Sequence, residues 1–131
     1  MFPVVDFTTL DPVYPDKLSP AGARYHPTRA ALLARGQAAL RRLYDRPEKV
    51  IVVVSHSGFL RVCVSGCYYM NADYRIFDFA DPAPAGHPDH GQLHLRQHRE
   101  TEEKGGGLGR SWTDMVILGS DLPDQLPVKL V

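Results

Sequence analysis

Residues 50–54 read Val-Ile-Val-Val-Val, and this run constrains the fold more than any other part of the chain. Five consecutive β-forming residues without polar alternation predict a strand that is buried on both faces. Strands of this kind occur in parallel sheets that helices cover on both sides, so the run favours an α/β fold. A Ser-His-Ser-Gly turn follows at residues 55–58, and residues 59–65 are expected to form a helix.

Another helix is expected before this strand, at residues 28–46. Pro27 suits the start of a helix, and apolar residues recur at steps of three and four, so that they share one face. The residues on this face are Leu32, Leu33, Gly36, Leu40, Leu43 and Tyr44. The order helix, strand, turn and helix predicts a three-layer α/β sandwich with a mainly parallel sheet. Further strands are expected at residues 74–79 and 92–100.

The length of 131 residues allows one domain, and we expect residues 1–131 to form a single unit. Four prolines in residues 1–25 predict an extended segment that lies over the body of the domain. Residues 26–111 are expected to form the α/β body. Residues 112–131 are expected to form an irregular tail.

Charge and apolar patterning exclude several classes of partner. Lys and Arg number 15, as do Asp and Glu, so the formal net charge is zero. This balance excludes a whole-molecule basic field, and we expect neither nucleic acid nor a membrane as a partner. No apolar run reaches the roughly 18 residues of a membrane span, and the start lacks a basic signal-peptide region, so a cytoplasmic location is expected. Cys63 and Cys67 are predicted to be buried free thiols on a helix.

The turn after the predicted strand is the candidate site. Ligands of open parallel sheets bind outside the carboxyl ends of the strands, where His56 stands. A histidine there can donate to a phosphoryl oxygen or move a proton. Ser55, Ser57, Gly58 and Arg61 are the candidate phosphate-binding residues, because a helix start presents free N–H groups to an anion. Two alternatives stay open: His56 caps the turn, and Arg61 faces water.

Two other patterns are weaker. His87, His90, His94 and His98 are spaced closely enough to suggest a metal site, but their loop-and-strand context and the missing carboxylate or cysteine partners argue against one. Residues 105–109 are rich in glycine but lack the Gly-Lys-Ser/Thr ending of a phosphate loop. We expect no metal and no cofactor.

Residues 52–61, Val-Val-Val-Ser-His-Ser-Gly-Phe-Leu-Arg, resemble the second histidine motif of the histidine phosphatase superfamily. Within this superfamily, these residues resemble the phosphoglycerate mutase-like branch, which is common in fungi. It extends to residues 14–17, 71–75 and 101–109, and so covers most of residues 2–111.

The resemblance implies a phosphate pocket around two histidines. In the superfamily, a histidine in an Arg-His-Gly motif forms a phosphohistidine, and an acidic residue protonates the leaving oxygen. His56 matches the second histidine, which implies that it donates to the transferring phosphoryl oxygens. This sequence contains no Arg-His-Gly motif. It resembles a C-terminal half that lacks the nucleophile, the arginine beside it and the matched general acid.

The missing motif has consequences for assembly and activity. Without the strand that carries it, the predicted strand at residues 50–54 loses a neighbour. We therefore expect a homo-oligomer, a rebuilt sheet, or a separate chain that supplies the missing half. The resulting prediction is a phosphoglycerate mutase-like protein that retains the second-histidine turn but is not a competent phosphatase alone. The alternatives are a member that binds a small phosphorylated or anionic metabolite, one that uses His56 as a general acid or base in non-phosphoryl chemistry, and a truncated product without activity.

Overall fold

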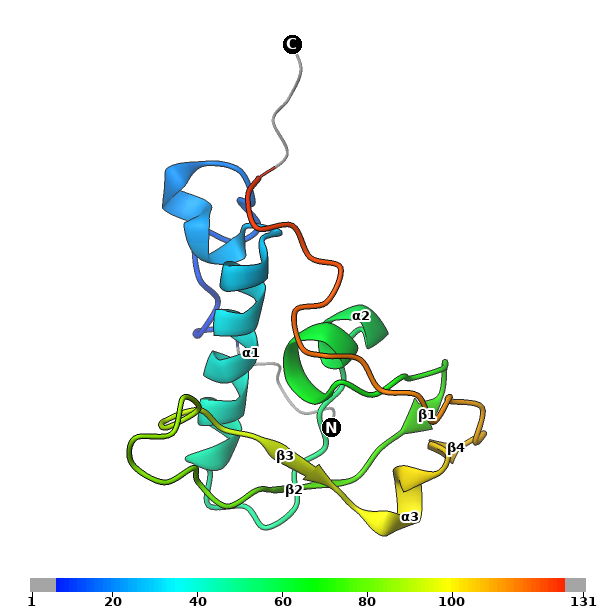
Figure 1. The fold of residues 1–131 in the computed structure, drawn as a ribbon. Coiled ribbons are helices and arrows are strands. Elements are labelled where there is room, and N and C mark those ends of the chain that lie inside the picture. Colours follow the sequence, from blue (N-terminus) through cyan, green and yellow to red (C-terminus); the bar gives the residue numbers. More distant parts are fainter. Residues whose placement is uncertain (1–6, 127–131) are drawn as a thin grey trace.

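The longest element of the computed structural model, which describes residues 7–126, is helix α1 (Arg29–Tyr44), which stands along one side of the molecule (Figure 1). Thr28 caps its start, because the Thr28 hydroxyl accepts a hydrogen bond from the backbone N–H of Ala31 at 3.4 Å. Asp45 closes its end through a backbone N–H that donates to Arg41. The helix expected at residues 28–46 is confirmed. No helix among residues 7–126 is long and apolar enough to cross a membrane.

The other elements are short. A 3-10 helix, η1 (Pro20–Tyr25), precedes α1. The second predicted helix is also confirmed; it begins two residues early as α2 (Ser57–Phe59) and continues as the π-helical η2 (Leu60–Ser65). The remaining elements are β1 (Asp73–Tyr74), β2 (Phe77–Phe79), β3 (Leu95–Gln97), α3 (Arg99–Glu102) and β4 (Gly106–Gly107).

The predicted three-layer α/β sandwich with a mainly parallel sheet is wrong. Within residues 7–126 the strands form two separate two-stranded sheets, and both are antiparallel. β1 pairs with β4, and β2 pairs with β3 so that Asp78 lies opposite Arg96. A parallel sheet requires crossover connections between neighbouring strands, and no parallel pair forms in this part of the chain.

Residues 50–54 are the clearest departure from the expected sheet. They form no strand, and their backbone makes no hydrogen bond to any residue in the described range 7–126. Val50, Val52 and Val54 are 84%, 85% and 92% exposed. A β-forming run becomes a strand only when a neighbouring strand satisfies its backbone groups. The part of the chain that the structure describes places no such strand beside it.

The core is small and lies where α1 packs against η2. The buried apolar side chains are those of Leu40, Cys63, Cys67 and Leu93. Gly36 permits the close approach of the two helices, since a Cβ at this position would lie 1.9 Å from the Cys63 carbonyl oxygen. Both cysteines are free and buried, as predicted, although Cys67 lies just beyond the end of η2.

Two irregular segments complete the molecule. Residues 112–126 form neither helix nor strand, apart from an isolated bridge between Met115 and Cys67. This segment runs past η2 and returns to the start of α1, where the Arg29 side chain pairs with Asp124 at 2.9 Å (Figure 1). At the other end, residues 7–19 consist of turns. The ends of the two predicted terminal segments, residues 1–6 and 127–131, lie outside the described range.

Candidate functional site

His56 stands at the start of α2 with extended backbone angles, φ −83° and ψ 140°. Its carbonyl oxygen accepts a hydrogen bond from the N–H of Leu60 at 3.0 Å, which begins the helix. Its side chain makes no capping hydrogen bond, so the cap alternative is not realised. Ser55, Ser57 and Gly58 are exposed beside it. The turn therefore presents an open imidazole and free backbone N–H groups to solvent.

The position of this turn differs from the expected one. His56 was predicted to follow a buried strand at the edge of a parallel sheet, but residues 50–54 are exposed and pair with no other described segment. Within residues 7–126, no side chain makes a hydrogen bond or ion pair with the His56 imidazole. A nucleophile and its base are ordinarily within hydrogen-bond reach of each other, and the turn holds no such pair.

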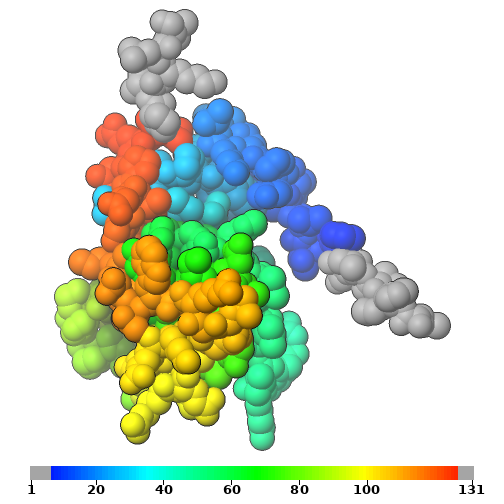
Figure 2. Space-filling view, turned by 90° about the vertical axis from the view of Figure 1, so that its right-hand side faces the viewer, coloured from blue at the N-terminus to red at the C-terminus, as the bar shows by residue number. Residues whose placement is uncertain are grey.

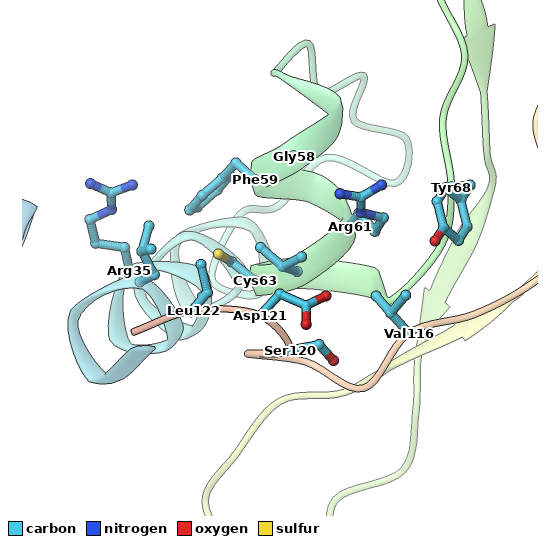
Figure 3. Close-up of a pocket in the computed structure, with 12 residues that line it drawn as sticks. Arg35, Gly58, Phe59, Arg61, Cys63, Tyr68, Val116, Ser120, Asp121 and Leu122 are labelled. Atoms are coloured by element: carbon cyan, nitrogen blue, oxygen red, sulfur yellow. The ribbon is translucent and has the colours of Figure 1, made fainter. Parts of the chain in front are cut away.

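A pocket of about 400 Å³ lies close to this turn but does not include His56 (Figure 3). It lies between α1, the α2–η2 helix and the C-terminal segment. Of the five candidate residues, Gly58 and Arg61 line it, whereas Ser55, His56 and Ser57 do not. The structure thus divides the predicted phosphate site into an exposed turn and a separate pocket. Because two arginines line the pocket, we call it the arginine pocket.

Arg61 is half-buried and lies over an aromatic ring. Its guanidinium carbon is 4.8 Å from the centroid of the Tyr68 ring, within the range of a cation–π contact. Its Nε is buried and has no hydrogen-bond partner in the described residues. Arg61 therefore lines the arginine pocket with its guanidinium group over the Tyr68 ring.

Arg35 is the second arginine of this pocket, and sequence reasoning missed it. Its guanidinium carbon lies 5.4 Å from the centroid of the Phe59 ring and 5.9 Å from that of Tyr25. Arg35 is not one of the residues that define the apolar face of α1, so the apolar pattern did not single it out. One available signal was its spacing, since it follows Leu32 by one turn and Leu32 also lines the pocket.

The C-terminal segment forms the remaining wall, and two backbone hydrogen bonds hold it on η2. The N–H of Gly119 donates to Val62 at 2.7 Å, and the N–H of Val116 donates to Gly66 at 2.9 Å. Gly66 ends η2 with a φ of 76°, a conformation that favours glycine. Asp121 and Ser120 then stand at the pocket rim. Asp121 therefore adds an acidic side chain to a pocket that two arginines also line.

Perturbed titratable groups lie elsewhere and have structural roles. Hydrogen bonds from the Ser19 side chain and backbone and from the Leu18 backbone lower the pKa of Asp16 to about 2. Burial raises the pKa of Tyr69 to about 12, although its hydroxyl bonds with Ser65 at 2.9 Å. Burial likewise raises the pKa of the Cys63 thiol. Both effects keep these groups neutral, so neither is activated for catalysis.

The histidine-rich loop does not assemble a metal centre in the described part of the chain, residues 7–126, where no group of three or more His, Cys, Asp or Glu side chains is placed to hold an ion. His87 lies 3.8 Å from Asp89 through Nδ1, and His90 contacts the carbonyl of Ala83. His98 instead accepts from the N–H of Glu100 at the start of α3.

Compared with known proteins, the chain matches no protein-family model, no curated protein and no solved structure.

Proposed function

We propose that this chain carries the second-histidine part of a histidine phosphatase-like site and that another chain completes that site. One observation carries the proposal: residues 50–54 are β-forming and exposed, pair with no strand among residues 7–126, and lead directly into His56. A partner strand beside them would satisfy their backbone groups and fix the turn that follows. On this proposal, the chain alone is not a competent phosphatase.

The large accessible surface of the chain supports the proposal that a partner is missing. The accessible surface is 10410 Å², whereas a compact monomer of 14.6 kDa has about 6,900 Å². The six residues before and five after the described range would contribute at most about 1,800 Å² even in a fully extended chain. About 1,700 Å² of excess then remains on this chain, more than the roughly 800 Å² that each partner buries in an interface of standard size.

The chemistry of residues 50–54 indicates how the partner binds. Their free N–H and C=O groups suit the addition of a strand from another chain, and valine side chains suit burial against it. In Figure 2 the turquoise segment that leads up to residue 50 lies on the outer surface of the molecule. The exposed side chains of Val50, Val52 and Val54 make the run itself accessible to an added strand.

The expected roles in the completed site follow from the turn. His56 donates to the oxygens of the transferring phosphoryl group and stabilises their charge. The backbone N–H groups at Ser57 and Gly58 and the hydroxyl of Ser55 hold the same oxygens. The partner supplies the nucleophilic histidine, which forms a bond to phosphorus as the bond to the leaving oxygen breaks. Water then hydrolyses the phosphohistidine and returns the site to its starting state.

Aryl phosphate hydrolysis tests the proposal in two steps. The purified chain and its His56→Ala variant should both show no turnover above buffer. Each purified protein is then mixed with the N-terminal half of a phosphoglycerate mutase-like phosphatase. This half contains the strand that ends in the Arg-His-Gly motif. The mixture with wild type should hydrolyse the substrate at least 100-fold faster than the mixture with His56→Ala.

Val52→Lys is the matched control for the interface. A lysine in the centre of the exposed run opposes burial of a paired strand, so this variant should fail to activate the mixture while leaving His56 intact. Turnover by the isolated chain, or a mixture whose activity is indifferent to His56→Ala, would contradict the proposal.

A further inference from the structure

The arginine pocket has the dimensions and lining of a small-molecule site. Its volume of about 400 Å³ lies within the range of such sites. Figure 3 shows the side chains of Arg35 and Arg61 on either side of Phe59, above the segment that carries Asp121. Three separate parts of the chain line it, and it is partly open to solvent: α1, the α2–η2 helix and the C-terminal segment form its walls.

Two guanidinium groups in this pocket lack acidic partners. Within residues 7–126, the side chains of Arg35 and Arg61 make neither a hydrogen bond nor a salt bridge. The Nε of Arg61 is buried without a partner, a condition that costs free energy until an acceptor is supplied. Guanidinium donors of this kind suit carboxylate and phosphate groups, which they bind in a two-pronged manner.

Apart from Ser120 and Asp121, most of the remaining lining is apolar or aromatic. Leu32, Phe59, Val62, Val116 and Leu122 line the pocket, and Tyr68 adds a second ring. The two arginines outweigh the single carboxylate of Asp121, so the pocket carries a net positive charge at neutral pH. Such a site favours a ligand with a flat apolar body and one negatively charged group.

We infer that the arginine pocket binds a small aromatic anion, with its phosphate or carboxylate on Arg61 and its ring against Phe59. Arg35 adds a second positive charge across the Phe59 ring. Asp121 and Ser120 at the rim accept hydrogen bonds from a hydroxyl or amine of the ligand. His56 does not line the pocket, so this inference does not rest on the proposed function.

Binding is measured with phenyl phosphate and benzoate, which share a ring but differ in the charged group. Benzyl alcohol is the neutral analogue, and inorganic phosphate is the anion without a ring. The fluorescence of Trp112 reports occupancy, because its ring centroid lies 5.1 Å from that of Tyr68. Side-chain Nε–H resonances of the arginines in NMR spectra give a second, local readout.

Arg61→Gln and Arg35→Gln should each weaken binding of the preferred anion at least 10-fold. Arg42→Gln is the matched control, since Arg42 is exposed on the same helix and does not line the pocket. Arg61→Lys keeps the charge but loses the planar donors, so it should weaken binding by an intermediate factor. The ratio of the dissociation constants of phenyl phosphate and benzoate for the wild type shows whether phosphate or carboxylate is the preferred group.

Three results would overturn the inference. The first is no binding of either aromatic anion to the wild type at millimolar concentration. The second is equal binding of benzyl alcohol, which would show that the charge is irrelevant. The third is an equal loss of affinity in all three Gln variants, or no loss in any. Thermal unfolding of each variant shows whether a lost signal reflects binding or folding.

Discussion

The side-chain amide of Gln37 makes two hydrogen bonds with the backbone of Leu93. Its Nε2 donates to the Leu93 carbonyl oxygen at 2.9 Å, and its Oε1 accepts from the Leu93 N–H at 2.9 Å. The two residues are 56 positions apart, and Leu93 is one of the few buried apolar residues. The Gln37 amide therefore joins the middle of α1 to the segment that leads into β3. It satisfies both backbone groups of Leu93, as a neighbouring strand would do in a sheet.

Gln37→Glu is expected to destabilise the fold by about 1–3 kcal/mol, because a carboxylate cannot donate to the Leu93 carbonyl and leaves it unsatisfied. Urea unfolding followed by circular dichroism measures the loss. Gln92→Glu is the matched control, since Gln92 is exposed and its side chain makes no hydrogen bond within residues 7–126. Equal shifts of the urea midpoint in both variants would show that the amide bridge contributes nothing.

Gly36→Ala should destabilise the contact between α1 and η2. The added Cβ would lie 1.9 Å from the Cys63 carbonyl oxygen, so the helices must separate. Overpacking of this kind costs about 1–3 kcal/mol, and the better helix propensity of alanine returns up to about 1 kcal/mol. Urea unfolding should therefore show a net loss.

Gly58→Ala is the matched control for this change. Nothing lies within 4 Å of a Cβ at Gly58, and the position is helical. Alanine there should leave the urea midpoint unchanged or raise it slightly, because it reduces the freedom of the unfolded chain. If Gly36→Ala stabilises the protein as much as Gly58→Ala does, the close approach of α1 and η2 is not present in solution.

Both helical stretches were predictable because their signals are local. The apolar spacing of residues 28–46 and the cap at Thr28 act over one or two turns, and so does the turn before α2. The buried state of Cys63 followed from the same helical context. None of these features depends on which other segment lies nearby.

The strand pairing and the arginine pocket were not predictable, because both depend on which distant segments of the chain meet. Residues 50–54 have the composition of a buried strand, but a strand also needs a partner that local composition does not identify. The pocket brings together Arg35, Arg61 and Asp121 from three parts of the chain, so no short motif contains it. The motif at residues 52–61 located an exposed turn and one wall of the pocket, but not the pocket itself.

The turn at Asp16 should make the free energy of unfolding decrease in acid. Hydrogen bonds from the Ser19 side chain and backbone and from the Leu18 backbone lower the pKa of Asp16 to about 2 in the folded state, against 3.8 as its ordinary value. The folded pKa is below the unfolded one, so this stabilisation is complete above about pH 4 and is lost as the pH falls towards 2.

Urea midpoints measured between pH 6 and pH 2.5 check this dependence. Asp16→Asn should reduce the drop below pH 4, because the amide does not titrate. Asp114→Asn is the control, since Asp114 is exposed and its side chain makes no hydrogen bond among residues 7–126. A wild-type drop that persists unchanged in Asp16→Asn would mean that other carboxylates, such as Asp73, account for the acid sensitivity.

The last prediction concerns the backbone of residues 50–54. Their N–H groups make no hydrogen bond within the described range, so in a monomer they should exchange with deuterium at nearly the rate of an unfolded chain. The amides of Leu40 and its neighbours in α1 should exchange far more slowly and serve as the internal control. Addition of a strand-bearing partner should protect the amides of residues 50–54 in particular. Protection of the same amides in the purified chain, lost on dilution or in Val52→Lys, would identify a second copy of this chain as the partner. Protection that survives both dilution and Val52→Lys would contradict the exposed state of this segment and, with it, the proposal that another chain pairs with it.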